Sequence, residues 1–162
     1  MKHKPVLERD DVARILQTAR AEALANHWAV SIAIVDDGGH PLALERLDGA
    51  APVSAYIATE KARTSAMGRR PTKAYEVMIN SGRTSFLSAP LSAMLEGGVP
   101  IVVDQQIIGA VGVSGVKSEQ DAQVASAGAA VVATPAQAKA GEHVIGERPA
   151  FPATPTPRGG QG

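Results

Sequence analysis

The sequence predicts an α+β domain built on an antiparallel sheet. Residues 31–50 and 97–115 each predict a strand, a tight turn and a return strand, because apolar residues alternate on both sides of a turn. Helical patterns precede, separate and follow these two segments, and no helix lies between the strands of either one. Strands joined directly by hairpins pair antiparallel, and helices then cover the sheet.

The first predicted element is an amphipathic helix over residues 8–26. Apolar side chains recur on one of its faces at helical spacing: Val12, Ile15, Leu16, Ala19 and Ala23. Asp10 and Asp11 stand in the first turn, where the positive end of the helix dipole favours carboxylates. Asn26 is a suitable residue for its end.

The first hairpin begins near Trp28, where the apolar period changes to two. Alternate residues from Val30 to Ile34 point to one face of the predicted sheet. Residues 36–39, Asp-Asp-Gly-Gly, supply the turn, because glycine adopts positive φ without penalty. The return strand contains Leu42 and Leu44 and ends at residues 48–49.

Two helices are predicted between the hairpins. Pro52 suits the first turn of a helix that continues to Met67, with Gly68 as its C-cap. Its alanines recur at spacings of three and four, which gives a smooth face for packing on a sheet. Thr72 is suited to cap a further short helix around Tyr75. Residues 81–97 are less regular, and we expect a loop with a short helix there.

The second hairpin covers residues 99–114, and its return strand contains three glycines. Such glycines indicate that another backbone or a ligand approaches closely. Ser118 is predicted to cap a last helix that runs to about Val132. Residues 1–134 therefore form the predicted domain. Residues 135–162, rich in proline and glycine, form a predicted tail that is disordered or packed on a neighbouring subunit.

The amino-acid composition excludes several classes of function and of binding site. The chain has 162 residues, of which 44% are hydrophobic, and this suits one domain with a substantial core. Sixteen basic residues balance sixteen acidic ones, so nothing indicates binding to nucleic acid or to a membrane. The absence of cysteine excludes disulfides and thiolate metal sites. No secretory signal follows Met1, and we expect a cytoplasmic protein.

Several motifs resemble those of the GlcG/HbpS family, which comprises haem-binding and glycolate-operon-associated proteins. The matching segments are residues 34–42, 46–50, 61–66, 97–101 and 108–115. The similarity extends from about Leu7 to Val132 in the order of the family. The resemblance implies a profilin-like antiparallel sheet of about five strands with helices on both sides. It also implies assembly into homodimers or octamers. The fifth strand is expected within residues 81–92 or near the N-terminus.

The resemblance makes haem the leading ligand, and haem needs an axial ligand and an apolar slot. His40, beside the Gly-Gly turn, is the best-placed imidazole and the candidate metal ligand, although a turn residue alone also explains it. His3, His27 and His143 are less well placed. No spacing of the HExxH type predicts a dedicated metal site.

Other candidate ligand-binding residues lie where strands end. Arg46 and Asp48 point to one side of a strand, either as a structural salt bridge or as a carboxylate-binding arginine with its orienting aspartate. Gly97 and Gly98 form either a kink that offers backbone amides to an anion or a plain turn. Ser114 ends the last strand at a possible anion-binding corner.

An enzyme is the alternative to a binding protein. Lys61 lies among alanines of the helix that packs on the sheet, where it is either partly desolvated or an ordinary surface lysine. If the protein is an enzyme, we expect Arg46 to bind a small carboxylate or carbonyl metabolite. Lys61, Asp48 or Glu96 would then transfer protons as an acid or base. A third possibility is an accessory subunit without chemistry of its own. The leading hypothesis remains a small-ligand-binding protein whose ligand is haem.

Overall fold

The computed structural model describes residue 1 and residues 3–133, and within them it contains one antiparallel sheet of four strands in the order β2-β1-β4-β3. The strands are β1 (Ser31–Asp36), β2 (Pro41–Arg46), β3 (Gly98–Val103) and β4 (Gln106–Ser114). The predicted α+β class is confirmed. The expected strand count of about five is too high for the described residues, because residues 81–92 contain a 3-10 helix, η1 (Thr84–Ser88), in place of a strand. The predicted tail, residues 135–162, lies outside the described residues.

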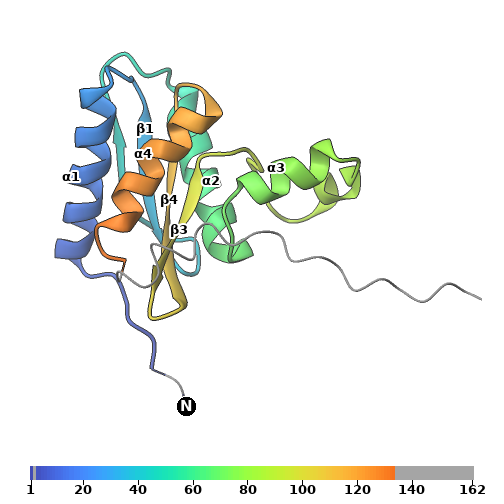
Figure 1. Cartoon of the computed structure of the whole chain (residues 1–162), viewed down its shortest axis with the longest axis horizontal. Coiled ribbons are helices and arrows are strands. Elements are labelled where there is room, and N and C mark those ends of the chain that lie inside the picture. Colours follow the sequence, from blue (N-terminus) through green and yellow to red (C-terminus); the bar gives the residue numbers. More distant parts are fainter. Residues whose placement is uncertain (2, 134–162) are drawn as a thin grey trace, which may run out of the picture.

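Helices lie on both sides of the sheet (Figure 1). The helices are α1 (Arg9–Ala25), α2 (Val53–Gly68), α3 (Lys73–Asn80) and α4 (Ser118–Ala130). The α1 and α4 helices pack on the face that carries Ile32 and Ile34, whereas α2 packs on the face that carries Ala33 and Val35. The α3 helix and η1 project away from this body (Figure 1). None of the helices in the described part of the chain is long and apolar enough to cross a membrane.

The two faces of the sheet have different cores. The face under α1 and α4 carries a large aliphatic cluster, whereas the face under α2 is lined almost entirely by alanines. Small residues let α2 approach the sheet closely: a Cβ on Gly112 would lie 2.0 Å from the carbonyl oxygen of Ala58. The close backbone approach predicted for the glycines of β4 is therefore confirmed, and the approaching group is a helix of the same chain.

The end of α2 differs from the prediction. Gly68 is its last helical residue, and Arg69 is the C-cap, in the left-handed conformation with φ of 56°. Gly68 instead makes room for Tyr75, because a Cβ at residue 68 would lie 2.1 Å from the Tyr75 hydroxyl. Similarly, Lys117 is the N-cap of α4, and Ser118 is its first helical residue.

The strand order places β2 and β3 at the two edges of the sheet. Both hairpin turns lie at one end of the sheet, and the residues around Arg46, Gly98 and Ser114 lie at the other end. The α2 helix packs mainly over β4 and β1 and contacts β2 much less, so the same face of β2 is covered only in part. Leu44, on that face, is 52% exposed.

Candidate functional site

A groove of about 640 Å³ lies between β2 and α2. Its floor is formed by β1 and β2, and its wall is formed by α2 and the residues that precede this helix. The side chains that give it its chemical character are Leu44, Arg46, Tyr56, Thr59, Glu60 and Arg63. Its volume falls within the range of about 300–1,000 Å³ that is usual for small-ligand sites. This groove is the candidate site.

The groove exists because α2 lies mainly over β4 and β1 and covers edge strand β2 only in part. Leu44 and Tyr56 are 52% and 75% exposed, although both carry large apolar groups. Contiguous exposed apolar side chains mark ligand or protein contacts more often than isolated ones do. The groove therefore offers an apolar surface that the described part of the chain does not cover.

Two arginines of the groove differ in their partners. The Arg63 Nε donates to the Gly39 carbonyl oxygen at 3.2 Å, and its guanidinium also forms an ion pair with Glu60. Arg46 has no ion pair or side-chain hydrogen bond within the described residues, and no such contact joins it to Asp48. The salt bridge that the sequence allowed between these two side chains is thus not formed there. Arg46 is a cation available to a ligand carboxylate.

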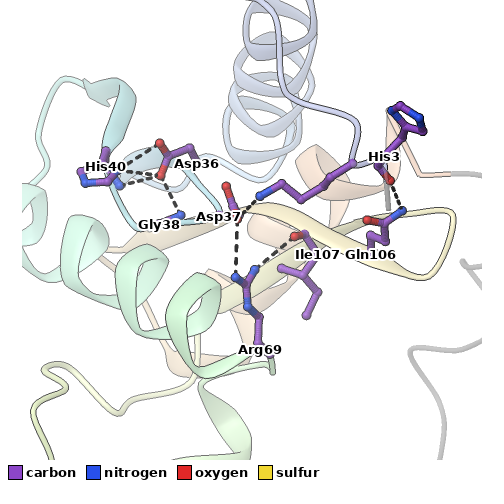
Figure 2. A network of polar contacts seen from close by, with 9 residues as sticks. His3, Asp36, Asp37, Gly38, His40, Arg69, Gln106 and Ile107 are labelled. Atoms are coloured by element: carbon purple, nitrogen blue, oxygen red, sulfur yellow. Dashed lines mark hydrogen bonds and ion pairs between the residues drawn. The ribbon is translucent and has the colours of Figure 1, made fainter. Parts of the chain in front are cut away.

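His40 lies at the turn between β1 and β2 and precedes the lining residue Pro41 in the chain, but it does not itself line the groove (Figure 2). Its Nδ1 lies 3.1 Å from Asp36 Oδ2, and Asp36 Oδ1 accepts the backbone N–H groups of Gly38 and His40, each at 2.9 Å. Burial acts to raise the pKa of Asp36, but these hydrogen bonds together hold it below its ordinary value. The carboxylate thus fixes the imidazole through Nδ1, as in many metal-binding histidines, and leaves Nε2 as the outward nitrogen.

The neighbouring contacts hold this turn in place (Figure 2). Asp37 forms ion pairs with Lys4 and with Arg69, and Lys4 is the main cause that lowers the pKa of Asp37. Arg69 also donates to the Ile107 carbonyl oxygen at 3.1 Å. The N-terminal segment, the end of α2 and both hairpin turns are therefore joined at one end of the sheet.

Lys61 lies on another side of α2, away from the groove lining. Its Nζ donates to Asp121 Oδ2 at 2.9 Å and to the Val113 carbonyl oxygen at 3.0 Å. Both side chains of this ion pair are only 3% exposed. Burial raises the pKa of Asp121, and the nearby Lys61 opposes that shift. Of the two alternatives that the sequence left open for Lys61, the structure shows the desolvated one, but its partner Asp121 was not predicted because 60 residues separate the two.

Gly97 and Gly98 lie close to Lys61, where α2 packs against the sheet. The Gly98 amide donates to Thr72 Oγ1 at 2.8 Å, so this amide is not offered to an anion. A Cβ on Gly98 would lie 2.4 Å from the Lys61 carbonyl oxygen, and one on Gly97 would lie 2.8 Å from Lys61 Nζ. These contacts explain both glycines by the close approach of α2.

The remaining predicted site residues do not lie together in the groove. Glu96 forms an ion pair with Lys73 at 3.0 Å. Ser114 is buried opposite Ser31 and does not line the groove. Asp48 is exposed beyond β2, on the edge of the sheet opposite Gly97. Among the residues that the structure describes, no group of three or more His, Asp or Glu side chains is placed to hold a metal ion.

Comparisons with known proteins show which protein family this chain resembles. A family model described as "Haem degrading protein HbpS-like" matches residues 7–130. Protein GlcG of Escherichia coli strain K12 is 60% identical over 114 residues, which cover 70% of this chain and 85% of GlcG. The crystal structure of HbpS superposes with a TM-score of 0.74 at 30% identity, covering 83% of this chain and 95% of HbpS. The structure of a PduOC–haem complex gives a TM-score of 0.71 at 26% identity, covering 79% of this chain and 96% of that one.

Proposed function

This chain belongs to the HbpS-like family, and we propose that it is a small-ligand-binding protein whose ligand is haem. The observation that carries the proposal is the groove between β2 and α2, which combines an apolar floor with the guanidinium of Arg46, for which the described residues provide no ion-pair partner. Haem presents the matching chemistry, a flat apolar ring with carboxylates at one edge. The likeness to a PduOC–haem complex supports the same ligand.

The residues present fit this ligand. Leu44 and Tyr56 offer apolar surface for the ring, and Arg46 offers a charge-assisted hydrogen bond to a propionate. His40 would hold the haem iron through Nε2, because Asp36 already contacts the other ring nitrogen. Bound haem would supply an iron centre whose properties depend on that axial ligand and on the polarity around it.

The acid–base enzyme has no comparable support. Lys61 is engaged by Asp121, Glu96 is engaged by Lys73, and Asp48 lies at the other edge of the sheet. None of these three candidate catalytic residues lines the groove. We therefore propose no second function.

Titration with haemin tests the proposal. We expect a sharp Soret band that saturates at a fixed stoichiometry. In the Arg46→Gln variant we expect the haemin affinity to fall by roughly tenfold to a hundredfold, since a charged hydrogen bond contributes about 1.5–3 kcal/mol. A broad, featureless band with the unaltered chain would refute haem binding.

The axial ligand is tested separately. His40→Ala should move or abolish the Soret band, whereas the matched control His27→Asn should leave it unchanged. Asparagine suits the control because residue 27 has φ of 58° and asparagine tolerates that conformation. An identical spectrum for wild type and His40→Ala would remove His40 from the site.

A further inference from the structure

The groove between β2 and α2 carries its charged side chains at its two ends. Arg46 is the last residue of β2, and it pairs with Ser31 of β1. The Ser31 hydroxyl contacts the Ser54 hydroxyl at 2.8 Å, so the first turn of α2 lies at this same end. This turn contains no acidic residue, and the positive end of the helix dipole adds to the charge of Arg46. One end of the groove is therefore cationic.

The opposite end of the groove contains an ion pair. Arg63 donates from its Nε to the Gly39 carbonyl oxygen at 3.2 Å, which places it beside the turn that precedes β2. Its guanidinium also contacts the Glu60 carboxylate, and both side chains remain partly exposed in the groove wall. Glu60 is the single acidic side chain among the described residues that line the groove. It neutralises Arg63, so this end carries no net charge.

The two ends are too far apart for one carboxylate to contact both. Along β1, the partners of Arg46 and Pro41 are four residues or about 13 Å apart, and this measure does not include the irregularity of β2. Along the axis of α2, Ser54 and Arg63 are nine residues or about 13 Å apart. A carboxylate that is bound by Arg46 therefore leaves the ion pair at the other end undisturbed.

We propose that Glu60 determines which tetrapyrroles the groove accepts, and this inference rests on the proposed function. Because Glu60 neutralises Arg63, only Arg46 offers a carboxylate a cation without an ion-pair partner among the described residues. Haem suits this arrangement, since its carboxylates lie at one edge of the ring. A porphyrin with a carboxylate on every pyrrole ring does not, because some of these groups must enter the Glu60 end. The groove therefore selects a ligand whose anionic groups all lie at one edge.

Desolvation and repulsion both act against a carboxylate at the Glu60 end. The Arg63 guanidinium is already engaged there by Glu60 and by the Gly39 carbonyl oxygen. A carboxylate that enters this end loses water without gaining a free cation, and a charge that leaves water without a partner is strongly disfavoured. The nearby Glu60 carboxylate also repels it. Glu60 thus acts on the ligand chiefly by engaging the cation that would otherwise bind a second carboxylate.

Iron-free porphyrins test this charge recognition without a contribution from an axial ligand. Protoporphyrin carries its carboxylates at one edge, whereas coproporphyrin carries one on each pyrrole ring. In fluorescence titrations we expect the wild-type chain to bind protoporphyrin about tenfold more tightly than coproporphyrin. In the Glu60→Gln variant the coproporphyrin affinity should rise by roughly tenfold, because Arg63 becomes available. The protoporphyrin affinity should change by less than about twofold.

Two further variants separate this mechanism from other causes. Glu119→Gln removes the same charge from an exposed position on α4 and should leave both affinities unchanged. The double variant Glu60→Gln, Arg63→Gln also removes the freed cation, so coproporphyrin should bind as weakly as it does to the wild type. Equal wild-type affinities for the two porphyrins, an unchanged affinity ratio in Glu60→Gln, or a double variant that keeps the gain would overturn this inference alone. If the wild-type chain binds neither porphyrin and no haemin, the proposed function falls with it.

Discussion

The two sides of α2 meet the same sheet in opposite ways. Toward β4, Ala58 and Ala62 press against Gly112 so closely that any side chain on that glycine would collide with helix backbone. Toward β2, Tyr56 and Glu60 stand over an open groove of about 640 Å³. One helix therefore forms a closed contact on one side and a ligand-sized opening on the other. The comparison teaches that the site lies where close packing by small residues ends.

The cations on the two sides also differ in burial and in ion pairing. Lys61 is 3% exposed and engages Asp121, whereas Arg46 is exposed and has no ion pair among the described residues. A buried charge is tolerated only with a partner, but an exposed one stays available. We therefore expect substitutions on the closed side to change stability and those on the open side to change ligand binding.

The largest expected effect comes from Lys61→Met. The change leaves the Asp121 carboxylate buried without its cation, and we expect a loss of about 3–5 kcal/mol in the free energy of unfolding. Urea unfolding measures it. Arg46→Met, the matched control on the open side, should change stability by less than about 0.5 kcal/mol. Equal losses in the two variants would abolish the distinction between the sides. The double variant Lys61→Met, Asp121→Leu should recover most of the loss.

Gly112→Ala should have the next largest effect. Its Cβ would lie 2.0 Å from the Ala58 carbonyl oxygen and 2.5 Å from the Ala62 nitrogen, so α2 must shift. We expect a loss of about 1–3 kcal/mol, measured by thermal unfolding. Ala21→Ser, at an exposed position of α1, is the control and should change the free energy of unfolding by less than about 0.5 kcal/mol. A Gly112→Ala variant with unchanged stability would show that the contact between α2 and β4 is not tight.

The pH dependence of stability should have opposite signs in the two regions. Burial raises the pKa of Asp121 above 3.8, so its contribution to stability is complete below that value and declines as the pH rises through the folded pKa. Hydrogen bonds lower the pKa of Asp36 below 3.8, so its contribution is present above that value and is lost as the pH falls through the folded pKa. The wild-type advantage over Asp121→Asn should therefore shrink with rising pH, and that over Asp36→Asn should grow. Unfolding of each variant at roughly pH 3 to 8 measures this, and slopes of the same sign would contradict it.

The smallest effect on stability is expected for Tyr56→Ala. The side chain is 75% exposed, and its loss should change the free energy of unfolding by less than about 0.5 kcal/mol. Haemin affinity should nevertheless fall several-fold, because the ring loses apolar contact. Tyr75→Ala, at a tyrosine that is 5% exposed, should instead cost about 3–5 kcal/mol. A large stability loss in Tyr56→Ala would mean that the groove wall is part of the core.

The elements themselves were predictable from the sequence. The alternation around residues 36–39, the helical spacing from Val12 to Ala23 and the alanine face of α2 are local patterns, and each produced the expected element. The α+β class and the close approach at the β4 glycines follow from them. The predicted helix caps, Gly68 and Ser118, lie one residue away from those observed, because close packing by Tyr75 decides the first end and a hydrogen bond from the Lys117 N–H to Gln120 Oε1 at 3.2 Å decides the second.

Only the tertiary structure decided which of these elements meet. Local periodicity shows which face of a strand is apolar, but strand order decides which strand lies at an edge, and that order left β2 covered only in part. The partner of Lys61 lies 60 residues away, and no local pattern indicates a contact at that separation. Short-range preferences determine the elements, and the burial of all of them together determines the site.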